Sequence, residues 1–249
     1  MYFLIRALGA VAVALCFAAP AAHASVVIAG TRVIFNAAEG ETTVRLTNDN
    51  TRPALVEAWI DDGNANSTPD TAHTPFLITP PLFRMDANKD QSLRILYVQG
   101  AQPLPTDRES VFWLNVLEVP PKPTGPQFAG KNYLQFAIRT RIKLFYRPAK
   151  LPGDVLKAPD QLIFKAAASG RNVTLVAHNP TPYYITISSV FLGADKAGIQ
   201  GADGMVAPFG DLQLPLKGHA QAPAAGTPIT FVTINDYGAG DTHKGVIAQ

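Results

Sequence analysis

The chain has 249 residues, a formal net charge of +2 from 21 basic and 19 acidic residues, and a single cysteine. This balance excludes the strongly charged surface through which a protein attracts nucleic acid or an anionic membrane. One cysteine cannot form an internal disulfide, so the folded part must be stabilised by its own hydrophobic cores.

Residues 1–24 have the features of a secretory signal peptide. One cation, Arg6, precedes a short apolar run, and small residues occupy the two positions that a signal peptidase reads. The run is too short for a membrane span, and no later stretch approaches the roughly 20 apolar residues that a span needs. A leucine precedes Cys16 where a lipoprotein signal has a small residue, so we expect no lipid anchor. We therefore expect residues 25–249 to be exported without membrane insertion.

The first half of the exported chain is typical of an antiparallel β-sandwich. Turn-forming stretches such as AAEGE and PLPTD separate the apolar segments, and no long 3.6-residue period is present. Asp61 and Asp62 resemble part of a calcium loop without its terminal glutamate, and we interpret them as a solvated turn. Seven or so strands with turns every 8–12 residues predict an immunoglobulin-like domain over residues 25–147. Short β-branched segments predict its strands at 26–35, 42–48, 54–60, 92–98 and 110–119.

The segment 132–148, NYLQFAIRTRIKLFYRP, predicts one further strand of more than twice the usual length. Apolar residues occupy one side of the alternation. The other side carries four cations: Arg139, Arg141, Lys143 and Arg147.

The second half predicts another sandwich, over residues 148–249. Prolines between 148 and 152 limit strand pairing and mark the domain boundary. The stretch 193–204 matches no motif. Further strand-like segments lie at 161–167, 172–179, 183–192, 204–210 and 228–236. The predicted fold class is all-β, with two immunoglobulin-like β-sandwich domains.

The sequence carries no pattern of a catalytic or metal site. The histidines are scattered, without a metal-ligand spacing, and neither a nucleophile elbow nor a phosphate-binding glycine loop is present. We expect no catalytic residues, no metal and no cofactor, and we expect that the protein is not an enzyme.

Six phrases together resemble one family. They are TRVIF, PALVEAWID, FLITPPLFRM, DRESVFWLNVLEVPP, NYLQFAIRTRIKLFYRP and INDYG, at residues 31–35, 53–61, 76–85, 107–121, 132–148 and 234–238. In this order, over nearly the whole chain, they resemble the periplasmic chaperones of the chaperone–usher pilus pathway. The resemblance implies two immunoglobulin-like sandwiches in an L-shaped arrangement. One member of this family is a known example of the sandwich fold.

The resemblance also implies a mechanism and partners. Pilus subunits of this pathway are sandwiches without their last strand, and the chaperone lends an edge strand to complete them before delivery to an outer-membrane usher. On this basis Leu134, Phe136 and Ile138 would enter the groove of a subunit. Ile142 and Leu144 would instead face the core of the chaperone. Whether the free protein dimerises to cover its apolar strand is left open.

Two cations correspond to the family's anchor for the subunit's C-terminal carboxylate: Arg32 and Lys143. Two cations in a desolvated cleft would hold a carboxylate firmly and in a fixed orientation. Lys143 has odd parity, whereas the apolar row is even, so a regular strand would direct it to the opposite face. The approach to the cleft then needs a bulge, a twist or a route over the strand edge.

A second group corresponds to a structural network between the two domains: Glu109, Arg147 and Asp236. A guanidinium between two carboxylates would fix the angle between the domains. The loop at 121–131 is short, and the mature chain would lack the cysteine pair of long-loop members, so the chain resembles the short-loop branch.

Two alternatives stay open at this point. A secreted immunoglobulin-like adhesin or structural pilus component would also be all-β, but the exported chain enters its first strand directly, without an alternating N-terminal extension. An enzyme on a sandwich scaffold would need clustered metal ligands. The sequence identifies neither the subunits, nor the usher, nor the type of pilus.

Overall fold

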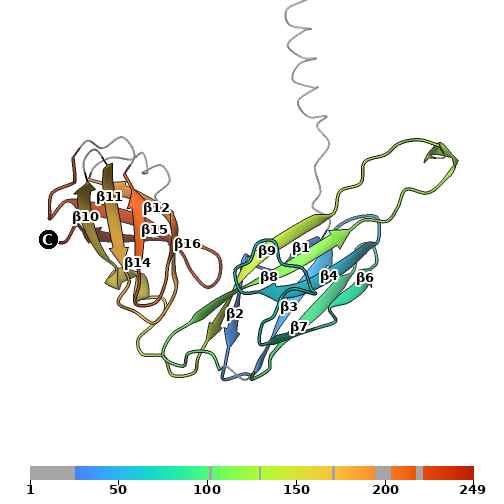
Figure 1. The fold of residues 1–249 in the computed structure, drawn as a ribbon, viewed down its shortest axis with the longest axis horizontal. Coiled ribbons are helices and arrows are strands. Elements are labelled where there is room, and N and C mark those ends of the chain that lie inside the picture. The colour runs from blue at the N-terminus through green and yellow to red at the C-terminus, as the bar shows by residue number, and fades with distance from the viewer. Residues whose placement is uncertain (1–25, 101–102, 129, 170–171, 194–202, 217–220) are drawn as a thin grey trace, which may run out of the picture.

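The structure is a computed structural model that describes residues 26–100, 103–128, 130–169, 172–193, 203–216 and 221–249. The predicted signal peptide and most of the unassigned stretch at 193–204 lie outside the described residues. The described chain forms two lobes of β-strands, set at an angle to one another (Figure 1). The prediction of an all-β fold with two immunoglobulin-like domains in an L-shape is confirmed. None of the described segments is a helix with the length and apolarity needed to cross a bilayer.

The first lobe contains two sheets, with strand orders β1-β3-β7-β5 and β2-β9-β8-β4-β6. The segment predicted as one strand at 26–35 forms two, because Gly30 has a φ of +105° and turns the chain from one sheet into the other. The strands are β1 (Val26–Ile28), β2 (Arg32–Asn36), β3 (Glu41–Asn48), β4 (Ala54–Asp61), β5 (Phe76–Thr79), β6 (Leu82–Met85), β7 (Asp90–Tyr97), β8 (Ser110–Val119) and β9 (Ile138–Arg147).

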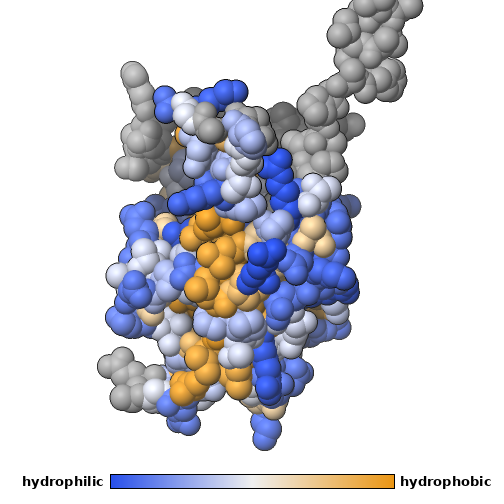
Figure 2. Space-filling view, turned by 90° about the vertical axis from the view of Figure 1, so that its right-hand side faces the viewer, coloured by the Kyte–Doolittle hydropathy of each residue, from blue (hydrophilic) through white to orange (hydrophobic). Residues whose placement is uncertain are grey.

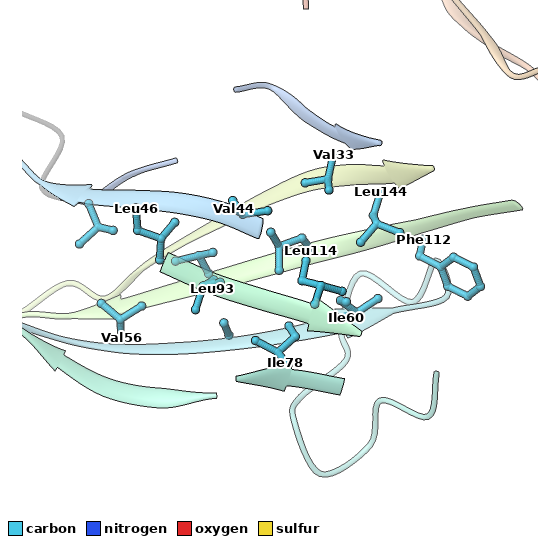
Figure 3. Close-up of a cluster of buried hydrophobic side chains, with 14 of the residues drawn as sticks. Val33, Val44, Leu46, Val56, Ile60, Ile78, Leu93, Phe112, Leu114 and Leu144 are labelled. Atoms are coloured by element: carbon cyan, nitrogen blue, oxygen red, sulfur yellow. The ribbon is translucent and has the colours of Figure 1, made fainter. Parts of the chain in front are cut away.

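Alternating side chains from both sheets fill the core of the first lobe (Figure 3). Leu46, Leu93, Leu114 and Leu144 are fully buried there, each from a different strand. Burial of such a side chain stabilises a fold by roughly 1.5–3 kcal/mol. Leu144 therefore faces the core, and Ile142 is half-buried against it, as the alternation predicts.

The second lobe contains a three-stranded sheet, β10-β11-β14, and a four-stranded sheet, β13-β12-β15-β16. Two of its strands, β14 and β16, were not predicted. β16 is an edge strand with mostly exposed polar residues, so its sequence shows no apolar alternation. Its strands are β10 (Ile163–Ser169), β11 (Asn172–His178), β12 (Ile185–Leu192), β13 (Gly204–Val206), β14 (Asp211–Pro215), β15 (Pro228–Ile234) and β16 (Gly240–Val246). The short 3₁₀ helices η1 (Pro126–Phe128) and η2 (Ala158–Gln161) complete the elements.

Candidate functional site

Strand β9 has one edge that is only partly paired. Its edge toward β8 is paired from Ile138 to Tyr146. On the opposite edge, β2 pairs in parallel with residues 143–147 only. Among the described residues no strand pairs with that edge over 138–142. An unpaired edge presents backbone N–H and C=O groups that a further strand can bond.

An exposed apolar row spans the segment before β9 and the first residue of β9. Leu134, Phe136 and Ile138 are 78, 68 and 54 % exposed, and their spacing of two residues is that of one face of an extended chain. Leu134 and Phe136 belong to the connection between β8 and β9, which projects well beyond the sheets (Figure 1), and Ile138 is the first residue of β9. We call residues 120–137 the arm.

The prediction that the strand starts at residue 132 is wrong, because β9 begins at Ile138. The β8–β9 register, continued beyond Glu118 and Ile138, places prolines at positions 120, 121 and 123 opposite residues 133–136, in the part of the arm that leads into β9. A proline has no N–H and cannot donate to the ladder. The alternation of the sequence continues through the arm, but the pairing stops.

Arg32 and Lys143 lie side by side at the end of the unpaired edge of β9 over residues 138–142, which we call the bare edge. They are register partners in the parallel β2–β9 pair, so both side chains project from the same face of the sheet. Among the described residues neither cation forms an ion pair with a carboxylate. The structure therefore brings together the two cations that the resemblance pairs.

The electrostatics of the two cations are unfavourable in the free protein. Burial lowers the pKa of the Lys143 ammonium, and the charge of Arg32 lowers it further. Burial also lowers the pKa of Arg32, while the charge of Asp236 acts in the opposite direction. Arg32 donates from Nη1 to the carbonyl oxygen of Ile234 at 2.8 Å, but its buried Nε has no acceptor. An anion in the cleft would relieve the repulsion between the two cations.

The two cations line an open cleft of about 430 Å³ between the lobes. Trp113 lies next to Lys143 in the β8–β9 register and lines the same cleft, a position that was not predicted from the sequence. On the opposite side lie Ile234 and Gly238. Gly238 has a φ of +83°, and a Cβ there would overlap the hydroxyl of Thr31, so the close approach of the lobes requires glycine.

The opposite parity of Lys143 needs no bulge. The pairing of β9 is regular along its whole length, with Leu144 in the core and Lys143 on the outer face of the sheet. Of the three routes considered, a bulge is therefore contradicted. The cations lie beyond the end of the bare edge, where a chain that runs along this edge would reach them.

The three residues of the predicted interdomain network are in contact. Arg147 donates from Nε to Glu109 Oε1 at 2.6 Å, and from Nη1 and Nη2 to the two oxygens of Asp236 at 2.7 and 3.0 Å. The other oxygen of Glu109 accepts the backbone N–H of Tyr184 at 2.8 Å. Burial raises the pKa of Glu109, and the charge of Arg147 opposes that rise. Arg147 and Glu109 from the first lobe thus bind two segments of the second.

A second buried charge cluster was not predicted. Asp61 was interpreted as part of a solvated turn, but its side chain is 1 % exposed and that interpretation is wrong. Arg141 donates to both of its oxygens at 2.9 and 2.5 Å, and Asn115 donates at 2.7 Å. Arg141 also lies over the ring of Trp113, at 4.5 Å. Burial favours a raised pKa for Asp61, but these hydrogen bonds outweigh it and lower the pKa to about 2.

We expect Asp61 to make the first lobe sensitive to acid. Because its pKa is lower in the folded state than the ordinary value of 3.8, its contribution is complete above about pH 4 and is lost as the pH falls toward 2. The loss is about 2 kcal/mol. Urea unfolding followed by tryptophan fluorescence measures this directly, since both tryptophans, Trp59 and Trp113, lie in the first lobe.

The Asp61→Asn variant should lose this step between pH 4 and 2. The control is Asp62→Asn at the exposed neighbouring position, which should retain the step of the unchanged protein. Equal acid sensitivity of Asp61→Asn and the unchanged protein would contradict the ion-pair explanation.

Models of two domain families match almost all of the described chain. The model of the pili and flagellar-assembly chaperone PapD N-terminal domain matches residues 25–152, and that of the pili assembly chaperone PapD C-terminal domain matches residues 157–245. The chain belongs to the PapD family of pili-assembly chaperones. A chaperone named FimB/FhaD from Bordetella pertussis is 46 % identical over 247 residues, which are 98 % of this chain and 96 % of the relative.

Solved structures of chaperones have the same fold. The crystal structure of the YadV chaperone is 38 % identical, with a TM-score of 0.74 over 90 % of this chain and 100 % of that one. A structure of the Salmonella enterica SafA pilin in complex with the SafB chaperone gives a TM-score of 0.73 at 29 % identity, over 92 % of this chain and 99 % of that one.

Membership of the PapD family decides between the alternatives. The expected resemblance to pilus chaperones is confirmed, and the relatives are named as chaperones, so nothing favours an adhesin. The family consists of assembly chaperones and not of enzymes, in agreement with the expectation from sequence. Among the described residues no group of three or more potential ligands could hold a metal ion.

Proposed function

We propose that this chain is a periplasmic chaperone that binds pilus subunits by donor-strand complementation and delivers them to an outer-membrane usher. Residues 1–24 direct export, residues 25–147 form the domain that lends the strand, and residues 148–249 form the second domain. The relatives named as probable fimbrial chaperones and the SafA–SafB complex support the choice of partner. The observation that carries the proposal is the bare edge of β9, which continues an exposed apolar row and ends at two cations that form no ion pair with the described carboxylates.

The apolar row fills the groove of the subunit. Leu134, Phe136 and Ile138 are too exposed to contribute to the core of this lobe. Alternate residues of an extended chain lie about 6–7 Å apart, so each side chain can enter its own subsite. Burial of each is worth roughly 1.5–3 kcal/mol before the cost of ordering the chain. The three together make a large apolar contribution to the free energy of capture.

The cations define where the subunit strand ends. A terminal carboxylate in the cleft accepts charge-assisted hydrogen bonds from the Lys143 ammonium and from the Arg32 guanidinium, which both line it. Lys143 lies about 16 Å along the chain from Ile138 and about 30 Å from Leu134, at about 3.3 Å per residue. The anchor and the row therefore fit a terminal strand of about ten residues.

The position of the anchor also sets the direction of the lent pairing. The bare edge runs from 138 to 142, and the anchor lies immediately after it at Lys143. A subunit strand with its C-terminus at the anchor must run parallel to β9. β2 also runs parallel to β9 and begins at Arg32. The subunit strand would thus extend the line of β2 along the same edge.

Co-expression with subunits encoded nearby tests the function. We expect a subunit to co-purify with the unchanged protein from periplasm, and to be lost with Phe136→Asp, because a carboxylate cannot be buried in an apolar groove without a partner. Tyr133→Asp is the matched control. Tyr133 is 50 % exposed in the same segment but has the opposite parity, so that variant should retain the subunit. Retention by both variants would refute docking through the row.

A further inference from the structure

The part of the arm that leads into β9, residues 132–137, lacks the backbone hydrogen bonds that hold a strand in place. No backbone hydrogen bond among the described residues joins residues 132–137 to any other segment. The prolines opposite these residues remove the donors that a ladder would use. A segment of six residues without backbone bonds would sample many conformations, and ordering each backbone residue costs roughly 1–2 kcal/mol.

One side chain replaces the missing ladder. The amide of Gln135 donates from Nε2 to the carbonyl oxygen of Pro120 at 2.6 Å, across the two sides of the arm. Pro120 directly follows the end of β8 at Val119. The bond therefore fastens residues 132–137 to a residue whose position is set by the sheet.

This bond also determines where the apolar row points. In an extended chain successive side chains project to opposite sides. Because Gln135 is directed toward Pro120, its neighbours Leu134 and Phe136 are directed away from it, and both are largely exposed.

Apolar surface on the same lobe could otherwise receive the row. A groove beside the base of the arm is lined by Leu55, Val119, Pro120 and Pro121 among others. Figure 2 shows apolar side chains gathered on the end of the molecule that carries the arm. Collapse of Leu134 and Phe136 onto such surface would hide them from a partner.

We propose that Gln135 is a positioning residue, which holds the arm extended and its apolar row outward before a subunit arrives. This role rests on the proposed function of the row. A pre-ordered arm loses less conformational entropy on docking, so the tether speeds association. It affects dissociation little, since in the complex the arm is held by the subunit itself.

Two substitutions separate the tether from other effects of position 135. Gln135→Glu keeps the size of the side chain but removes the donor, and Gln135→Lys keeps a donor. The same two charges are introduced as controls at Ala137, which is exposed, has the same parity and has no tether. None of these residues contributes to the core, so all four variants should fold.

The first measurement needs no partner. Backbone ¹⁵N relaxation of the free protein should give order parameters for Leu134 and Phe136 that fall below about 0.6 in Gln135→Glu. They should remain at the value of the unchanged protein in Gln135→Lys and in both Ala137 variants. Unchanged order parameters in Gln135→Glu would overturn the proposal.

The second measurement uses the subunit that co-purifies with the unchanged protein, diluted from urea into each variant. We expect association to be about 5-fold slower with Gln135→Glu, with unchanged dissociation and near-normal rates for Gln135→Lys. Equal rates for the Glu and Lys variants would also overturn the proposal. If Phe136→Asp leaves association unaffected as well, the docking function itself is wrong, while the relaxation result still decides whether Gln135 orders the arm.

Discussion

Replacing Lys143 by alanine is expected to weaken the capture of a subunit by about 30-fold or more, and Arg32→Ala should act in the same way. A carboxylate held by two cations in a partly desolvated cleft loses about 2–5 kcal/mol when one partner is truncated. The backbone pairing and the apolar row remain in both variants, so the loss isolates the contribution of the anchor.

The same substitution should not destabilise the free protein. Burial and the charge of Arg32 both lower the pKa of Lys143, which means that its positive charge is unfavourable before an anion binds. The Lys143→Ala variant should therefore unfold at the same urea concentration as the unchanged protein, or at a higher one. A loss of capture together with a loss of stability would point to misfolding and not to the anchor.

Peptides with the sequence of the last dozen residues of a co-purifying subunit give the sharpest test. The free acid should bind the unchanged protein much more tightly than the C-terminal amide, and Lys143→Ala should remove that difference. Lys131→Ala is the control, since it removes an exposed lysine from the arm. Equal binding of acid and amide to the unchanged protein would refute the carboxylate anchor.

The fold was predictable where local pattern and final burial agree. β4 and β8 are rich in apolar and β-branched residues, are largely buried, and were recognised from that composition. β16 was not, because an edge strand with both faces largely wet needs no apolar period. The start of β9 was misplaced for a different reason, since alternation describes one segment and strand pairing depends on the donors of another, here Pro120 and Pro121.

The site was predictable only in part. Residues 32 and 143 are far apart in sequence, and periodicity cannot place them in register, so their pairing came from the family resemblance alone. Asp61 was misinterpreted because its burial depends on Arg141 and Asn115, which lie on strands that arrive much later in the chain. One local feature could have indicated that Asp61 lies in the sheet and not in a turn. Trp59 and Asp61 share one face of β4, and Trp113 and Asn115 share one face of β8.

Arg147→Ala is expected to be the most destabilising of the substitutions considered, at about 3–5 kcal/mol. Removal of one partner of a buried pair leaves the other charge without compensation, and the side chain of Glu109 is only 1 % exposed. Urea unfolding monitored by tryptophan fluorescence reports on the first lobe, which contains both Arg147 and Glu109.

The pH dependence of this deficit identifies its cause. Burial already raises the pKa of Glu109, and without Arg147 the pKa should rise further. Below its unfolded pKa of about 4.5 the carboxyl is protonated in both states and carries no charge penalty. Above its folded pKa the full penalty applies, so the deficit of Arg147→Ala should be largest at neutral pH and shrink as the pH falls below about 4.5.

A double substitution completes the argument. If an uncompensated carboxylate causes the loss, Arg147→Met combined with Glu109→Gln should be more stable than Arg147→Met alone, because the buried charge is gone. If the double variant is instead as unstable as the sum of the single ones, Arg147 acts mainly through its packing against Tyr183, over whose ring it lies at 5.5 Å. The network would then set the contact between the lobes by shape and not by charge.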